Sequence, residues 1–327
     1  MRIARKKDLT TRRFLSASLA LLLCAGFTTL SARSRSSARP THIRIPLWID
    51  PAPAELTAKD LTASLSGKAA PITGIQTPSS DLVILLVLDL TGDIALVDPA
   101  RQALIQQVKA LPPNAWVGLL RAQDGLSVLA DPTPNRKTIA DAIQALPVSG
   151  KAGLLDTVNA IAGLADGIVR KSNVRVAILY VTDSDITNYR EDFTNPVINS
   201  SDPHDLSRRF PEALIQEKIS SLQTQIAAGE APLFIVHLQY RSSRLNQAYQ
   251  NGLETLAEFT AGYGSFCRSQ AEIPEAIGKA FTYMRSAWFL TIGLPEREHS
   301  AVQVRLELAN HGDVHLAYRA RLSLKRK

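Results

Sequence analysis

The chain has 327 residues, of which 45% are hydrophobic and 20% are charged. This length and composition allow one large or two modest buried cores and exclude a disordered or fibrous protein. The formal charge of +7 arises mainly at the start of the chain, because residues 1–32 carry six basic side chains and one acidic one, which leaves +2 for the rest. No basic stripe with interleaved aromatic residues is visible, so we expect no nucleic acid partner.

Residues 1–32 have the pattern of an export signal. A basic segment precedes an apolar stretch, Leu15–Leu30, which ends in the small pair Ser31-Ala32. An uncleaved membrane anchor is the alternative, but about 16 apolar residues are short for a span. We therefore expect an exported protein, periplasmic or extracellular, with no stable membrane span in the mature chain. Residues 33–40 are polar and basic and are expected to form a linker.

The two cysteines exclude an internal disulfide in the mature chain. Cys24 lies within the predicted signal, so Cys267 has no partner. An exported domain without disulfides must be held together by its apolar core.

Two segments with alternating apolar and polar residues flank the middle of the chain. Residues 41–80 show this period of two, which is typical of strands, and so do residues 286–327 on both sides of a turn at 310–313. Each segment is too short to bury its apolar face alone. We predict a C-terminal β hairpin, 286–327, that pairs with an N-terminal β segment, 41–80, to form a small β domain.

Residues 81–285 alternate apolar runs with amphipathic helical patterns. The apolar runs cover 83–88, 174–181 and 233–238, and the first helix is predicted to start at Asp98-Pro99. Alternation of this kind implies a mostly parallel sheet covered by helices on both faces. We predict an α/β domain of three layers, inserted in the small β domain.

Oxygen-bearing side chains follow two of the predicted strands at the point where each strand ends. Asp89, Thr91 and Asp93 follow the first apolar run, and Asp183 follows the second. Ligands commonly bind at this edge of an open α/β sheet. If the two strands are neighbours, these four residues lie close together, and we call them the strand-end cluster.

The two strand ends resemble those of a von Willebrand factor type A domain. Residues 87–93, Val-Leu-Asp-Leu-Thr-Gly-Asp, and 181–183, Val-Thr-Asp, follow buried strands in the order of that family. Residues 56–61, 256–264 and 284–290 are similar to segments of one exported subgroup, the VWFA-related proteins known mainly from acidobacteria. The likeness covers residues 41–325 through short motifs. It implies a Rossmann-like, mostly parallel sheet with one antiparallel edge.

The resemblance also implies a metal-ion-dependent adhesion site for Mg²⁺, Mn²⁺ or Ca²⁺, cations that prefer oxygen ligands. In the family pattern, Asp89 matches the first Asp, Thr91 the first Ser and Asp183 the last Asp. Asp93 replaces the second Ser, and Ala152 stands where the family has a Thr. One ligand is therefore lost and another becomes charged. Whether an ion binds stays open.

Three functions fit these residues. The first is an exported, non-catalytic protein that recognises a protein or matrix partner at the strand-end cluster, aided by the irregular loop 184–208. The second is a metal-free structural module of the cell envelope, in which the polar strand ends cap helices or Lys151 takes the place of the ion. The third resembles the haloacid-dehalogenase-like phosphotransferases, with Asp89 as nucleophile.

The enzymatic alternative lacks supporting residues. The run 233–238 does not end in the acidic pair that aspartyl-phosphate chemistry needs, and the six histidines show no metal-ligand spacing. His237, within that run, is expected to be a satisfied core residue. We therefore expect a protein that is not an enzyme.

Overall fold

The structure is a computed structural model that describes residues 41–189, 211–294, 301–309 and 314–324. The predicted export signal 1–32 and the linker 33–40 lie outside these residues, as do most of the loop 184–208 and the turn 310–313. Within the described ranges, no helix is long and apolar enough to cross a membrane.

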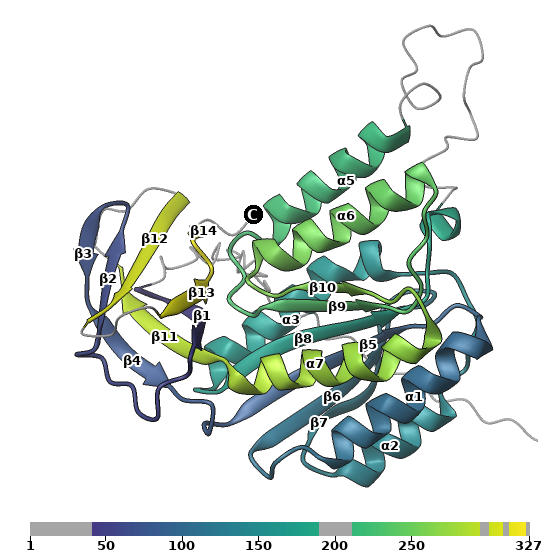
Figure 1. The fold of residues 1–327 in the computed structure, drawn as a ribbon, viewed down its shortest axis with the longest axis horizontal. Helices are drawn as coiled ribbons and strands as arrows, with labels where there is room; N and C mark the ends of the chain where they lie inside the picture. Colours follow the sequence, from purple (N-terminus) through teal and green to yellow (C-terminus); the bar gives the residue numbers. More distant parts are fainter. Residues whose placement is uncertain (1–40, 190–210, 295–300, 310–313, 325–327) are drawn as a thin grey trace, which may run out of the picture. The chain divides into compact units, whose positions relative to one another are not determined.

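The middle of the chain forms a six-stranded sheet (Figure 1). In the order in which they lie in the sheet, the strands are β10 (Gly264–Phe266), β9 (Leu233–His237), β8 (Arg175–Thr182), β5 (Leu82–Asp89), β6 (Ala115–Arg121) and β7 (Ser127–Thr133). Neighbouring strands from β10 to β6 are parallel, whereas β7 pairs with β6 in the antiparallel direction. The sheet is therefore mostly parallel with one antiparallel edge.

Helices cover both faces of this sheet (Figure 1). One face packs against α1 (Ile94–Lys109), α2 (Arg136–Ala145) and α7 (Ile273–Ser286), and the other against α3 (Leu154–Lys171), α5 (Pro211–Ile226) and α6 (Arg244–Phe259). Two 3-10 helices, η1 (Ile186–Tyr189) and η3 (Gln270–Glu272), complete the described helical elements. The predicted class, a three-layer α/β domain with a mostly parallel sheet, is confirmed.

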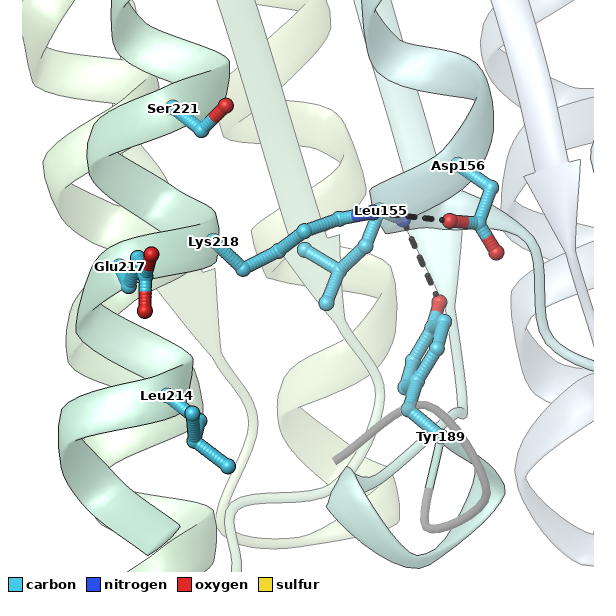
Figure 2. Close-up of a pocket in the computed structure, with 7 residues that line it drawn as sticks. All are labelled: Leu155, Asp156, Tyr189, Leu214, Glu217, Lys218 and Ser221. Carbon is cyan, nitrogen blue, oxygen red and sulfur yellow. Dashed lines mark hydrogen bonds and ion pairs between the residues drawn. The ribbon is translucent and has the colours of Figure 1, made fainter. Parts of the chain in front are cut away.

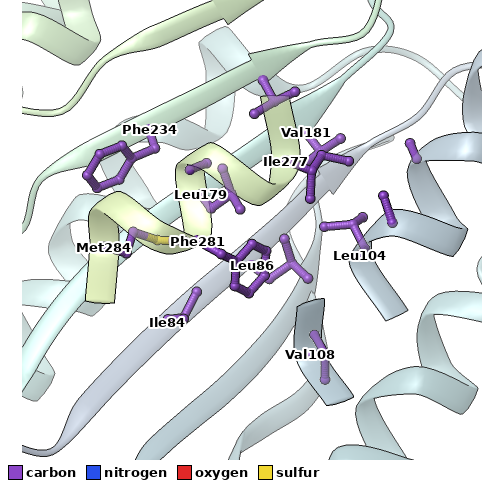
Figure 3. Packing of buried hydrophobic residues seen from close by; sticks show 14 of the residues in the cluster. Ile84, Leu86, Leu104, Val108, Leu179, Val181, Phe234, Ile277, Phe281 and Met284 are labelled. Atoms are coloured by element: carbon purple, nitrogen blue, oxygen red, sulfur yellow. The ribbon is translucent and has the colours of Figure 1, made fainter. Parts of the chain in front are cut away.

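The α/β domain has two hydrophobic cores, one on each face of the sheet, and the central strand β5 contributes to both. All eight of its residues are buried. Its side chains alternate between the faces. Ile84, Leu86 and Leu88 join the core under α1 and α7, whereas Val83, Leu85 and Val87 join the core under α3, α5 and α6. Figure 3 shows the first of these cores, in which side chains of α1 and α7 meet those of the strands.

The predicted start of α1 at Asp98-Pro99 is wrong. The helix begins at Ile94, five residues before Pro99, and Pro99 lies inside it. Its N-cap is Asp93, whose Oδ1 accepts a hydrogen bond from the N–H of Ala95 at 3.1 Å. An aspartate is among the best residues at this position, because its side chain satisfies a main-chain donor that has no partner within the helix.

The ends of the chain form two small antiparallel sheets. The first has the order β13 (His315–Tyr318), β1 (His42–Asp50), β11 (Trp288–Gly293), β4 (Ile72–Gln76), and the second β14 (Arg321–Ser323), β12 (Ala301–Leu308), β2 (Leu61–Leu65), β3 (Lys68–Ala70). Both contribute apolar side chains to a third core. Strands from both ends of the chain are paired in each sheet, as β1 with β11 and β2 with β12 show.

The segment 286–327 is not a single hairpin, as the alternating pattern had suggested. β12 pairs with β14 in one sheet, but β13 pairs with β1 in the other. Between β13 and β14 lies Arg319, which is 3% exposed. Its guanidinium donates to the main-chain oxygens of Ala227, at 2.9 Å, and Gly229. The predicted second strand of the hairpin is therefore divided into β13 and β14 at Arg319, whose side chain binds main-chain oxygens of the α/β domain.

Arg175, at the start of β8, binds both chain crossings between the two domains. The side chain is 1% exposed. It donates to the oxygens of Pro78 (2.6 Å) and Ser80 (2.8 Å) on the incoming segment, and to those of Arg285 (3.0 Å) and Ala287 (2.9 Å) on the returning one. A buried charge is tolerated when all its donors find acceptors, and here the acceptors are main-chain carbonyls.

We predict that Arg175→Ala lowers the free energy of unfolding by about 3 kcal/mol, because four main-chain carbonyls, which are buried or partly buried, lose a charged donor. Urea denaturation followed by tryptophan fluorescence measures this loss. Arg285→Ala is the matched control, since the Arg285 side chain is exposed and its removal should cost less than about 0.5 kcal/mol. Equal stability of the two variants would contradict the role assigned to Arg175.

Candidate functional site at the carboxyl edge of the sheet

Asp89, the last residue of β5, is fully buried and accepts four hydrogen bonds. Its Oδ1 receives the N–H of Gly153 at 2.9 Å. Its Oδ2 receives the N–H of Leu154 at 3.3 Å and the hydroxyls of Thr182 at 3.1 Å and Ser184 at 3.2 Å. The exposed fraction of its side chain is 0%. This carboxylate is thus enclosed by protein donors.

The donors of Gly153 and Leu154 come from the start of α3, which explains why Asp89 is tolerated there. The N-terminus of a helix carries main-chain N–H groups without helical partners and a partial positive charge. The chain can bring this terminus so close only because residue 153 is glycine. A Cβ at this position would lie 1.9 Å from the main-chain oxygen of Ala122.

Asp183 follows β8 and holds the loop between β5 and α1. Its Oδ1 accepts from the N–H of Thr91 at 2.6 Å and from the Thr91 hydroxyl at 2.9 Å. Its Oδ2 accepts from the N–H groups of Gly92 and Asp93, both at 3.1 Å. Thr91, Asp93 and Asp183 therefore lie together as predicted, and Asp93 in turn caps α1.

Asp89 is adjacent to this group but belongs to a separate set of hydrogen bonds. The N–H of Asp183 donates to the main-chain oxygen of Asp89 at 3.4 Å. However, the register pairs Asp89 with Thr182, so the two aspartates are one residue out of step. Side chains one residue apart along a strand point to opposite faces. The Asp89 carboxylate accordingly meets α3, and the Asp183 carboxylate meets the loop before α1.

The protonation of Asp89 is set mainly by its burial. Removal from water raises the pKa of the Asp89 carboxyl to about 6, against the opposing effect of the hydrogen bonds from Gly153, Thr182 and Ser184. The nearby charge of Asp183 adds a smaller increase. Near neutral pH the carboxylate is charged, and the four donors supply the stabilisation that water would otherwise provide.

A directly bound divalent ion does not fit this arrangement. All four carboxylate oxygens of Asp89 and Asp183 already face protein donors, and the Thr91 hydroxyl donates to Asp183. Ala152, at the position of the missing Thr ligand, is buried among apolar side chains. Within the described ranges, no group of three or more His, Cys, Asp or Glu side chains could hold a metal ion.

Sequence reasoning missed the buried hydroxyl network behind Asp89. The Thr182 and Ser184 hydroxyls are 2.6 Å apart, and Ser184 Oγ lies 3.3 Å from the Tyr249 hydroxyl of α6. The sequence could have predicted this network, because Thr182 and Ser184 stand on either side of Asp183. Side chains alternate along a strand, so both hydroxyls project to the side opposite Asp183. Gln123, also missed, is buried after β6 and donates to the main-chain oxygen of Leu90 at 2.5 Å.

His237, the last residue of β9, is a satisfied core residue. Its Nδ1 accepts from the N–H of Gln239 at 3.3 Å, so Nε2 carries the proton and donates to the oxygen of Ser184 at 2.6 Å. Burial lowers the pKa of the imidazole to about 4. The ring is therefore neutral near pH 7.

A cavity of about 290 Å³ lies beside the start of α3 (Figure 2). Its lining includes Tyr189, whose hydroxyl accepts from the N–H of Leu155 at 3.4 Å. Lys218 of α5 binds Asp156 of α3 at 3.1 Å across it. The ion pair between Lys218 and Asp156 thus joins α5 to the first turn of α3, next to the donors of Asp89.

No protein-family model and no curated protein matches this chain. Solved structures with similarity include a von Willebrand factor type A protein from Catenulispora acidiphila, with 11% identity, a TM-score of 0.44, and coverage of 88% of this chain and 75% of that one. The von Willebrand factor domain of the type V pili tip protein Mfa5 from Porphyromonas gingivalis has 13% identity and a TM-score of 0.43, with coverage of 62% and 94%. The PilB minor pilin from Streptococcus sanguinis has 12% identity and a TM-score of 0.45, with coverage of 66% and 63%.

These values are too low to transfer a partner or a residue role to this chain. The strand order, the single antiparallel edge and the helices on both faces define the class of fold, a three-layer, von Willebrand factor A-like domain. The roles of the residues rest on the geometry described above.

We predict that Asp89→Asn destabilises the protein by about 1–3 kcal/mol, because the amide nitrogen replaces one carboxylate oxygen and turns a donor towards the N–H of Gly153 or of Leu154, which then lacks an acceptor. Chemical denaturation measures the loss. Asp141→Asn is the control, since Asp141 is exposed on α2 and should cost less than about 0.5 kcal/mol. An unchanged stability of Asp89→Asn would show that the four donors do not depend on a carboxylate.

Proposed function

We propose that this chain is an exported, non-catalytic binding module that recognises a protein or matrix partner at the carboxyl edge of its sheet. Its strand-end cluster works without a divalent ion. The observation that carries the proposal is the saturation of both carboxylates, each of which accepts four hydrogen bonds from the protein.

In this proposal the two aspartates organise the surface from within. Asp183 fixes the main chain of residues 91–93, and Asp89 fixes the start of α3. Both loops are thereby held in a defined shape without a cation. A rigid loop surface costs a partner less conformational entropy on binding, which favours a role in recognition.

The position of the edge in the fold supports the same role. The segment from the small β domain enters β5 at its amino end, and the chain returns after α7 next to the same end, where Arg175 holds both. The carboxyl ends of the parallel strands lie at the opposite edge. There Ile94, which is 64% exposed, stands beside the exposed Asp93 at the start of α1. These two side chains are open to a partner.

The enzymatic alternative finds no support in this geometry. A nucleophilic aspartate needs a carboxylate oxygen that a phosphoryl group can reach. Asp89 is buried and both its oxygens accept protein hydrogen bonds. The metal-free structural module shares the proposed cluster and differs only in lacking a partner at the edge.

We predict that Mg²⁺, Mn²⁺ or Ca²⁺ at millimolar concentration, or a chelator, shifts the melting temperature by less than about 1 °C. An ion bound at 100 times its Kd would stabilise the fold by about 2.7 kcal/mol, which corresponds to several degrees. Differential scanning calorimetry measures the shift. Thr91→Val is the matched variant, because it removes a hydroxyl without changing the size of the side chain. An ion-specific stabilisation that Thr91→Val abolishes would refute the metal-free site.

We predict further that a partner captured from envelope extract stays bound in the presence of chelator and is lost with Ile94→Glu, which places a charge on an exposed apolar contact. Immobilised wild-type protein and variants are compared in the same extract. Asp141→Lys, an exposed change on α2, should keep the partner. If the partner is captured only in the presence of a divalent ion, the proposal that binding does not depend on an ion is refuted. If wild-type protein captures no partner, the structural module is favoured.

A further inference from the structure

A cavity of about 510 Å³ lies at the amino edge of the sheet, opposite the surface proposed for a partner. Its lining comes from the segment that enters β5, the segment that starts β6, the first residue of β8 and the C-terminal end of α7. The chain passes between the two domains at this place. Cavities of this volume commonly bind small molecules, and such sites occur often where domains meet.

The apolar part of the lining is the more buried one. Leu82 and Ala115 are each 1% exposed, and Pro78 and Pro112 are half-buried. The residues that α7 contributes are exposed and polar. A ligand with an apolar body and a polar end therefore matches the lining, because its apolar body would leave water on binding.

Both charged residues of the lining are arginines, and among the described residues that form it none is acidic. Arg175 is buried and makes five hydrogen bonds to main-chain oxygens, which equals the number of its N–H groups. These acceptors are neutral, and the acid whose charge acts on Arg175 is Asp81, an exposed residue next to Leu82. Arg175 thus brings positive charge to the cavity but has no N–H group left for a ligand.

Arg285 is the arginine that remains available to a ligand. Its main-chain oxygen accepts from Arg175, but its guanidinium has no hydrogen-bond or ion-pair partner in the described part of the chain. The neighbouring hydroxyls of Thr282 and Ser286 each donate to a main-chain oxygen of α7, at 3.0 Å and 3.1 Å. The exposed end of the cavity therefore offers one charged group whose donors are not yet used.

We propose that this cavity binds a small organic carboxylate, whose charged group pairs with Arg285 and whose apolar body lies against Leu82 and the two prolines. The planar guanidinium matches the two oxygens of a carboxylate. The site is independent of the function proposed for the carboxyl edge, which lies at the other end of the strands.

The number of available cations favours a carboxylate over a phosphate. A phosphate monoester carries nearly two negative charges near neutral pH and three acceptor oxygens. The Arg285 guanidinium balances one charge, and the donors of Arg175 are already committed to carbonyls. A phosphate would thus bring a second charge without a partner into the cavity, which is costly, whereas Arg285 alone balances a carboxylate.

Isothermal titration calorimetry of the full chain with phenylacetate tests the site. We expect saturable binding of one molecule per chain, with a dissociation constant below about 1 mM. Phenylacetamide has nearly the same shape but no charge, and it should bind about tenfold or more weakly, because a hydrogen bond to a charged group is lost. Phenyl phosphate should bind no more tightly than phenylacetate.

Three variants locate the ligand. Arg285→Ala should weaken the binding of phenylacetate about tenfold or more, and its expected stability means that lost affinity does not reflect unfolding. Thr282→Phe, an exposed change that adds a ring to the lining, should abolish binding. Lys109→Ala is the control, since Lys109 is an exposed cation at the end of α1 that does not line the cavity. Its removal should change the affinity by less than about twofold.

The absence of saturable binding at about 10 mM phenylacetate would overturn the proposal. Equal affinity for phenylacetamide, or tighter binding of phenyl phosphate, would overturn the assignment of a carboxylate to Arg285. Wild-type affinity in Arg285→Ala or Thr282→Phe would place the ligand outside this cavity, and so would an equal loss of affinity in Lys109→Ala.

Discussion

The enclosure of Asp89 is the constraint on which the carboxyl edge of the sheet depends. A carboxylate taken fully out of water is costly unless donors replace the water. Here the donors are the first N–H groups of α3 and two buried hydroxyls. This requirement fixes the approach of α3, and that approach in turn requires a residue without a side chain at Gly153. Polar residues whose pattern resembled a ligand site thus have a structural role, because they determine how α3 packs against the end of the sheet.

The same chemistry recurs at the amino end of the sheet with the opposite charge. Arg175 and Arg319 are buried, and both satisfy their guanidinium groups with main-chain carbonyls. Carbonyls at chain crossings and helix ends lack partners within a helix or sheet, so a single arginine can satisfy several of them. Buried acids therefore organise one edge of the α/β domain, and buried arginines join the other end to the small β domain.

The sequence predicts the layers well, because an unbroken apolar run such as Val83–Leu88 has no stable position except inside a covered sheet. It also places Asp183 beside Thr91 and Asp93. It cannot show that Asp89 faces away from Asp183, because that depends on a register in which Asp89 pairs with Thr182. The start of α1 was mistaken because Asp98-Pro99 and Asp93 are equally plausible beginnings in a linear pattern. In the sequence Arg319 looks like one more polar residue of a strand, because the carbonyls that it binds, those of Ala227 and Gly229, are about 90 residues away along the chain.

Strand β1 has a further consequence for the integrity of the chain. Its odd-numbered residues Ile43, Ile45 and Leu47 lie in the core of the small β domain, whereas Trp48 packs in a core of the α/β domain, where its indole N–H donates to Tyr283 at 2.9 Å. One strand near the N-terminus thus contributes to two hydrophobic interiors. Neither domain can be excised cleanly, because the α/β portion alone would lack Trp48 in one of its cores, and a truncation that extends through β1 would remove core side chains from both domains.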